Sequence, residues 1–168
     1  MDRSPPPVNV GPHGFLWGVA TSGYQSEGGY NNFGEPLNNW YRWALTRRDN
    51  RSGRAADFWT RYESDLDLAA GLGINAFRLG VEWTRLQPSL DPSTRTPPER
   101  DPAAAAHYGR ILTACRRRGL EPVVTLHHFV HPRWLGKDPW LREQTIELFA
   151  RHAEQTVRDL NETLEIGR

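Results

Sequence analysis

The chain has 168 residues, of which 38% are apolar and 24% are charged, and its formal net charge at pH 7 is +1. This balance is typical of one globular domain and gives no electrostatic reason to expect nucleic acid or a membrane as a partner. No apolar run approaches the ~20 residues that a membrane-spanning helix needs. Because Cys115 is the only cysteine, the sequence favours a reducing compartment, and we expect a cytoplasmic protein.

Residues 1–14 contain three consecutive prolines and are predicted to form a flexible segment, followed by one domain over residues 15–168. Short apolar runs predict buried strands at 15–20, 74–81 and 122–126. Helical periodicity predicts helices at 57–72, 102–119 and 141–160. In the last helix, the residues expected to face inward are Ile146, Phe149, Ala150, Ala153 and Val157.

The alternation of strands and helices predicts a parallel sheet covered by helices, an α/β fold. Two closures are compatible with this order, an open doubly wound sheet and a (β/α)8 barrel, and both place ligands at the carboxyl ends of the strands. No G-x-G-x-x-G or Walker-type loop follows a strand, which argues against nucleotide binding, and we expect no cofactor.

Polar residues follow each predicted strand, and these are the candidates for a site. Gln25 and Glu27 lie among small residues after the first strand, and Glu82 follows the second. Arg78 is a charge inside an otherwise apolar strand, so it needs an anionic partner. That partner is either an active-site carboxylate, which we favour, or a structural ion pair. Glu82 either completes a buried ion pair or lies in the site.

Three histidines, His127, His128 and His131, follow the third strand and raise the question of a metal. Adjacent strand residues point to opposite faces, so His127 and His128 do not easily share one ion, and we expect no metal site. A hydrogen-bonding role for His128 in a polyol site is favoured over a packed histidine. Cys115 falls on the apolar face of a helix and is expected in the core rather than as a nucleophile.

Three segments together resemble the N-terminal part of glycoside hydrolase family 1, the β-glucosidase and β-glycosidase family. They are FLWGVATSGYQSEGG at 15–29, INAFRLGVEWTRLQP at 74–88 and GLEPVVTLHHFVHPRWL at 119–135. The resemblance implies a (β/α)8 barrel that hydrolyses β-linked saccharides with retention. A whole barrel takes ~250 residues, so this chain would hold about the first three βα units.

The resemblance also implies roles for individual residues. Gln25 and His128 match positions that hydrogen-bond the hydroxyls of the sugar, and Arg78 matches the arginine that orients the nucleophilic carboxylate. Phe129 stands where the family usually has a sugar-contacting tryptophan, and it is retained as a substrate-binding candidate.

Both catalytic carboxylates of the family are missing from the sequence. The family has its acid/base in an Asn-Glu-Pro triplet after strand four and its nucleophile in a Glu-Asn-Gly stretch after strand seven. Neither motif occurs here. Asn161-Glu162 comes nearest to the first motif, but it is followed by Thr163 instead of proline. We therefore predict an O-glycosyl hydrolase piece that contributes sugar-binding residues and is inactive alone, with a second polypeptide as a possible complement. The alternatives are an inactive truncated remnant, a sugar-binding fragment and an unrelated open-sheet binding protein.

Overall fold

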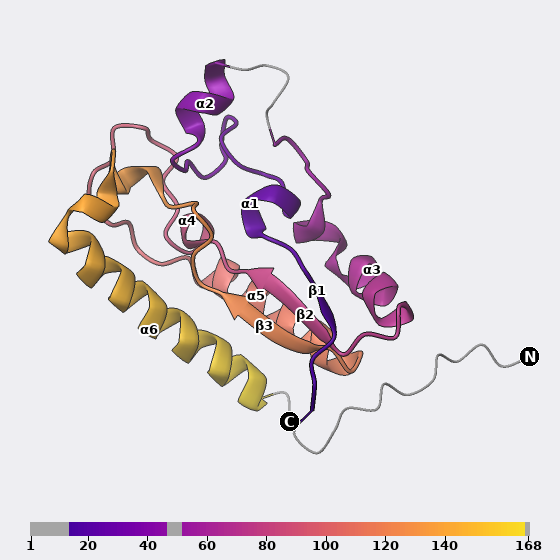
Figure 1. The fold of residues 1–168 in the computed structure, drawn as a ribbon. Coiled ribbons are helices and arrows are strands. Elements are labelled where there is room, and N and C mark those ends of the chain that lie inside the picture. The colour runs from indigo at the N-terminus through magenta and orange to yellow at the C-terminus, as the bar shows by residue number, and fades with distance from the viewer. Residues whose placement is uncertain (1–13, 47–51, 167–168) are drawn as a thin grey trace, which may run out of the picture.

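The computed structural model describes residues 14–46 and 52–166, and its centre is a parallel sheet of three strands (Figure 1). The strands are β1 (Gly18–Ala20), β2 (Ala76–Gly80) and β3 (Glu121–Thr125), in the spatial order β1-β2-β3. Arg78 of β2 lies opposite Ala20 on one side and Val123 on the other. The predicted parallel sheet is confirmed.

Three long helices connect and follow the strands: α3 (Phe58–Gly71), α5 (Pro102–Arg117) and α6 (Glu143–Ile166). The start of α5 is the one predicted from its sequence. Asp101 accepts hydrogen bonds from the backbone N–H groups of Ala103 and Ala104, and Pro102 occupies the first turn. None of the described helices combines the length and the apolar character needed to cross a membrane.

The main core lies on one face of the sheet, between β2 and the long helices. Phe77 and Leu79 point into it, and they pack against residues from all three helices, including Leu66, Ile111, Cys115 and Leu160. The burial of Cys115 confirms its predicted place in the core. Because the strands follow one another in sequence order and the helices share one core, the arrangement differs from a doubly wound sheet, which has helices on both faces.

Short helices gather at the carboxyl ends of the strands. They are α1 (Gly23–Ser26), α2 (Tyr41–Thr46), α4 (Trp83–Leu86) and the 3-10 helices η2 (Arg133–Leu135) and η3 (Pro139–Leu141). In Figure 1 the helices α1, α2 and α4 lie above the strands, opposite the end where α6 stops. This end of the sheet therefore carries the segments in which the candidate site residues lie.

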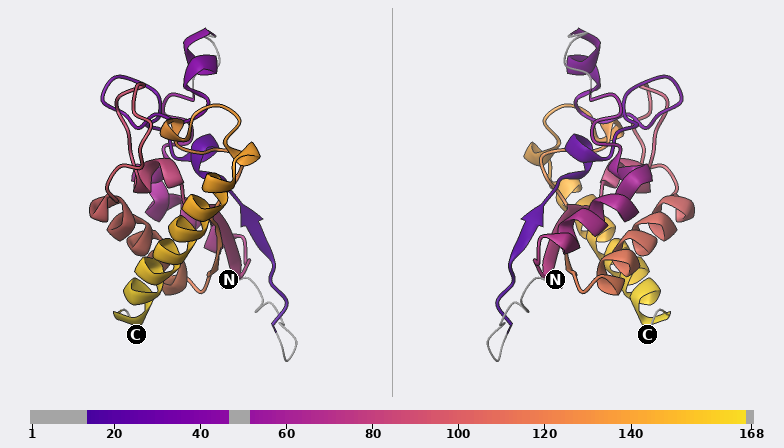
Figure 2. Two further views of the ribbon diagram at one scale, coloured as in Figure 1. Left: turned by 90° about the vertical axis from the view of Figure 1, so that its left-hand side faces the viewer. Right: turned by 90° about the vertical axis from the view of Figure 1, so that its right-hand side faces the viewer.

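The first strand is shorter and more exposed than predicted. Only Gly18–Ala20 pairs with β2, and the exposed fractions of Phe15 and Trp17 are 63% and 59%. Figure 2 shows β1 at the margin of the molecule, on the far side of the sheet from α6. The prediction of a buried strand is wrong because, within the described residues, β1 pairs on one side only and no helix packs over it. Residues 1–13 of the predicted flexible segment lie outside the described residues.

Only part of the predicted inward face of α6 is buried: Phe149 and Ala153 are half-buried, and the ring of Phe149 lies 5.9 Å from that of Trp83. Ile146 and Val157 have exposed fractions of 63% and 47%, and Ala150 is exposed, whereas the buried positions are Thr145, His152, Thr156 and Leu160. His152 stacks on the ring of Trp83 with centroids 4.6 Å apart. The helix packs along α5, where Leu160 joins the main core, and His152 packs against Trp83. These contacts decide which side of the helix is buried.

Candidate functional site

The segments that follow the three strands form one rim at the carboxyl edge of the sheet. Hydrogen bonds join them directly: the N–H of Thr21 donates to the carbonyl of Arg78 at 2.8 Å, and the N–H of Val81 donates to the carbonyl of Thr125 at 3.0 Å. Gln25, Arg78 and His128 come from three successive strands or the segments just after them, so the parallel sheet brings them to the same edge.

Gln25 lies exposed on α1, directly after β1. Its Oε1 accepts a hydrogen bond from the hydroxyl of Ser22 at 2.6 Å. The helix approaches the second strand closely at Gly23, where an added Cβ would lie 2.2 Å from Cγ of Glu82. Glycine at this position therefore lets α1 sit against the end of β2 and holds Gln25 at the rim.

Arg78 alternates with the core residues Phe77 and Leu79, so its side chain leaves β2 on the face opposite the helices. It is half-buried, and its Nε donates to Oγ1 of Thr125 at 2.7 Å. No carboxylate in residues 14–46 and 52–166 forms an ion pair with it. The alternative of a structural ion pair for Arg78 is therefore not found in the described chain.

His128 and Phe129 lie in the loop after β3, with ring centroids 4.8 Å apart. Phe129 is 44% exposed and has a φ of 53°, an uncommon backbone conformation for phenylalanine. Its carbonyl accepts from Nδ2 of Asn39 at 3.2 Å, and its ring meets Trp40 edge-on at 5.9 Å. Trp40 in turn stacks on Tyr24 of α1 at 6.1 Å. Aromatic contacts therefore connect the His128 loop to the helix that carries Gln25.

His127 and His131 lie near one another, with parallel rings 6.4 Å apart. Burial, with the neighbouring His127 and Arg142, lowers the pKa of His131 to about 4, so its imidazole is neutral at pH 7. Within the described part of the chain, no three His, Cys, Asp or Glu side chains converge as metal ligands.

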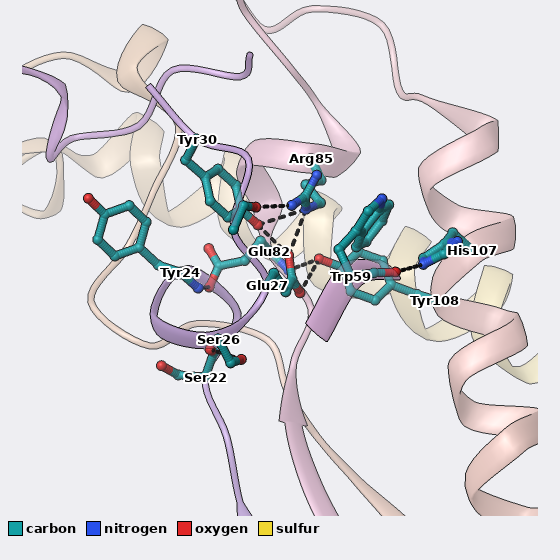
Figure 3. Close-up of polar contacts among 11 residues, drawn as sticks. Ser22, Tyr24, Ser26, Glu27, Tyr30, Trp59, Glu82, Arg85, His107 and Tyr108 are labelled. Carbon is teal, nitrogen blue, oxygen red and sulfur yellow. Dashed lines mark hydrogen bonds and ion pairs between the residues drawn. The ribbon is translucent and has the colours of Figure 1, made fainter. Parts of the chain in front are cut away.

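Glu27 does not face the rim with Gln25, so its inclusion among the candidate ligand-binding residues is wrong. Only 2% of Glu27 is exposed, and its Oε2 lies 2.6 Å from Nε of Arg85 (Figure 3). Its Oε1 accepts from the hydroxyl of Tyr108 at 2.8 Å, and Tyr30 donates to Oε2. Both oxygens are therefore occupied by protein donors.

Arg85, the cation of this ion pair, lies between two aromatic rings. Its guanidinium carbon is 3.9 Å from the ring centroid of Trp59 and 4.4 Å from that of Tyr30. The sequence analysis missed this network. The available signal was a pair of opposite charges, Glu27 and Arg85, each close in sequence to aromatic residues, but only the fold places them together.

Glu82 joins the same buried region without forming an ion pair in the described chain. Its side chain accepts from the N–H of Tyr24 at 3.1 Å, and its own N–H donates to the hydroxyl of Tyr108 at 3.0 Å. Burial, reinforced by the charge of Glu27, raises the pKa of Glu82 to about 8. Because only 4% of Glu82 is exposed, it supports the rim from inside rather than offering a group to a ligand.

Comparison with known proteins identifies the family to which the chain belongs. The model of the family described as glycosyl hydrolase family 1 matches residues 9–166. The chain belongs to glycosyl hydrolase family 1. The resemblance drawn from the three sequence segments is thereby confirmed, and the alternative of an unrelated open-sheet binding protein is wrong.

Relatives within family 1 include a 6-phospho-beta-galactosidase of Staphylococcus aureus (strain JH9), which is 33% identical over 90% of this chain and 31% of its own length. The crystal structure of beta-glycosidase BGL167 is 38% identical, with a TM-score of 0.75, over 92% of this chain and 35% of that protein. A beta-glycosidase from Pyrococcus horikoshii is 33% identical, with a TM-score of 0.71, over 88% of this chain and 33% of that protein.

The chain thus spans about a third of the length of the family 1 proteins that it matches. Its three parallel strands and covering helices form part of a (β/α)8 barrel, which confirms the predicted fold class. The uncovered face of the sheet, to which Arg78 belongs, corresponds to the inside of such a barrel.

Proposed function

We propose that this chain forms the first three βα units of a family 1 barrel and supplies part of its sugar subsite for the retaining hydrolysis of β-linked glycosides. In this proposal Gln25 and His128 hydrogen-bond sugar hydroxyls, and Phe129 offers an apolar ring beside them. The names of the relatives, a 6-phospho-beta-galactosidase and two beta-glycosidases, support a β-glycoside as the substrate class. The single cysteine, buried Cys115, suits a cytoplasmic location.

The environment of Arg78 carries the proposal. Its guanidinium is half-buried on the uncovered face of the sheet and donates to Thr125, but no carboxylate pairs with it in the described residues. A guanidinium in this position would favour the ionised form of a carboxylate placed beside it and fix its orientation. Retaining glycosidases need such a carboxylate ~5 Å from an acid/base partner. Arg78 is therefore proposed to orient a nucleophile that another segment supplies.

The second candidate function is sugar binding without catalysis. It is favoured by the surroundings of Arg78, since no carboxylate pairs with its guanidinium in the described residues. Under this alternative the rim would still bind a glycoside, but no nucleophile would meet Arg78.

Complementation separates the two functions. The purified chain is assayed on aryl β-glucoside, aryl β-galactoside and the 6-phosphate of the latter, alone and mixed with the separately produced strands four to eight of beta-glycosidase BGL167. We expect no turnover by the chain alone and clear turnover by the mixture. The N-terminal units of BGL167 mixed with the same partner serve as the positive control. If that control is active and the mixture with this chain is not, the proposed hydrolytic role is wrong.

Variants of the active mixture then test the residue roles. Arg78→Lys keeps the charge but loses the planar fork, and we expect kcat to fall at least ~100-fold with a smaller change in KM. Gln25→Ala should lower kcat/KM ~10–100-fold, because a hydroxyl of the sugar loses its partner. Ser26→Ala, on the same helix, is the control and should change neither parameter more than ~2-fold. Full activity of both Arg78→Lys and Gln25→Ala would contradict the assigned roles.

A further inference from the structure

A basic hollow of about 790 Å³ lies between α2 and the two 3-10 helices η2 and η3. It is a different place from the proposed sugar subsite, since Gln25, Arg78, His128 and Phe129 are not among its lining residues. The charged or titratable side chains that line it are Arg42, Arg95, His131, Arg133, Lys137 and Asp138.

The charges in the basic hollow are unbalanced. Asp138 is the only acidic residue among its described lining residues, and it lies 3.7 Å from Lys137. No carboxylate in the described ranges pairs with Arg42, Arg95 or Arg133. Burial, and then the positive charges of Arg42 and Arg95, lower the pKa of Arg133, so two like charges lie close to its guanidinium.

Arg133 is held in this crowded position by its surroundings. Its backbone N–H donates to the carbonyl of Leu37 at 3.0 Å, and its guanidinium lies over the ring of Tyr41 at 4.9 Å. Its Nε is buried without a hydrogen-bond partner in the described residues. A buried, charged donor without an acceptor is rare in folded proteins, because each such group loses its hydration without compensation.

His131 contributes a second unsatisfied group to the same hollow. Only 7% of this residue is exposed, and its Nδ1 has no hydrogen-bond partner among the described residues. Its backbone is fixed on both sides by Asn39: the N–H of His131 donates to Oδ1 of Asn39 at 3.1 Å, and its carbonyl accepts from the N–H of Asn39 at 3.0 Å. Backbone hydrogen bonds to Asn39 and Leu37 therefore hold His131 and Arg133, with their unsatisfied groups, in fixed positions beside the hollow.

We infer that the basic hollow binds an oxyanion, a carboxylate or phosphate group of a small ligand, between Arg42, Arg95 and Arg133. Planar guanidinium groups form paired hydrogen bonds with the oxygens of carboxylate and phosphate, which is the recognition that this set of side chains offers. A bound anion would offset the repulsion of Arg133 by Arg42 and Arg95 and would accept from the guanidinium groups that line the hollow. This inference does not depend on the proposed glycosidase function, since it uses no residue of the sugar subsite.

The test is isothermal titration of the full chain with sodium phosphate and, separately, with sodium acetate, at constant ionic strength set by chloride. We expect saturable binding of at least one anion. Saturation by phosphate alone would identify a phosphate group as the preferred ligand, and saturation by acetate alone would identify a carboxylate. The exposed pair of substitutions Arg42→Gln/Arg95→Gln should weaken this binding at least ~10-fold. Circular dichroism checks that the variant keeps the native fold.

The control is Arg61→Gln/Arg151→Gln, which removes the same charge from two exposed arginines outside the hollow. It should leave the dissociation constant within ~2-fold of the native value. Binding that weakens equally in both double variants would show a general charge effect and overturn the inference. Lack of saturation with either anion would also overturn it.

Chemical protection gives a second readout on the native chain. Phenylglyoxal modifies exposed guanidiniums, and mass spectrometry of peptides reports each site. Phosphate or acetate should slow modification of Arg42 and Arg95 while leaving Arg61 and Arg151 unchanged in the same sample. Equal rates with and without the anion at all four positions would contradict an anion site in the hollow.

Discussion

Nε of Arg85 donates to Oε2 of Glu27 across 2.6 Å, and the two side chains are only 10% and 2% exposed. These residues come from the segments after β1 and β2, so their ion pair joins the first two units of the barrel. It holds α1 and α4 together, because Glu27 directly follows α1 and Arg85 belongs to α4; Figure 3 shows the pair with its aromatic neighbours.

Arg85→Met should destabilise the chain strongly. Removing the guanidinium leaves Glu27 buried without its cation, and breaking a buried pair in this way costs about 3–5 kcal/mol. Urea unfolding followed by circular dichroism at one protein concentration measures the change. The control is Arg78→Met, which removes a half-buried arginine without an ion pair in the described chain and should cost about 1 kcal/mol or less. Equal losses in the two variants would contradict the importance of the Glu27–Arg85 pair.

Tyr108→Phe should also destabilise the chain, whereas Tyr24→Phe should not. The hydroxyl of Tyr108 donates to Glu27 and accepts from the N–H of Glu82, and it is fully buried. Its loss leaves two buried polar groups short of a partner, at a cost of about 1–3 kcal/mol. The hydroxyl of Tyr24 is buried and has no hydrogen-bond partner among the described residues, so its removal should be neutral or stabilising. The two midpoints of urea unfolding, compared directly, check this prediction.

The free energy of unfolding should fall as pH rises from 6.5 to 8.5, and Glu82 should account for this fall. The folded chain holds the pKa of Glu82 at about 8, above the ordinary value of 4.5, so the folded state keeps a proton that the unfolded state releases. The stabilisation is complete below pH 4.5 and is lost as pH rises through 8, with a slope of at most about 1.4 kcal/mol per pH unit.

Glu82→Gln keeps an acceptor for the N–H of Tyr24 and removes the titration. Its unfolding free energy should be nearly constant between pH 6.5 and 8.5, measured in urea at each pH. The measurements start at pH 6.5 because His131 and His152 contribute only at lower pH. Their pKa values in the folded chain are below the ordinary 6.5, so the unfolded state takes up protons more readily, and stability falls, as pH drops below 6.5. Glu147→Gln, an exposed position on α6, is the control and should retain the slope of the native chain.

The isolated chain should self-associate through the exposed apolar stripe of α6. Ile146, Ala150 and Val157 lie along one side of the helix, and a hollow of about 280 Å³ opens next to Val157, between α6 and β3. Exposed apolar surface of this kind favours association. Ile146→Glu/Val157→Glu should shift the chain toward monomer in analytical ultracentrifugation.

The matched control is Gln144→Glu/Gln155→Glu, which adds the same charge at exposed polar positions of the same helix. It should leave the association constant within ~3-fold of the native value. A native chain that is monomeric at all concentrations would refute the prediction, as would equal dissociation by the control.

The sequence by itself determined the family, the order of strands and helices and the edge of the sheet that carries the polar residues. These follow from local patterns: apolar runs for strands, helical periodicity for α3 and α5, and the capping signal at Asp101 and Pro102. It also determined that Arg78 leaves β2 opposite to Phe77 and Leu79, because side chains alternate along a strand.

Only the tertiary structure decided which polar groups are buried and which side of α6 is covered. The sequence groups Glu27 with Gln25 because both follow the first predicted strand, but the fold brings Arg85, Tyr30 and Tyr108 around Glu27 and leaves Gln25 at the surface. In α6, packing along α5 and against Trp83 buries His152 and leaves Ile146 exposed. The physical reason is the same in both cases: burial and ion pairing depend on contacts between segments far apart in the chain, and local periodicity carries no information about them.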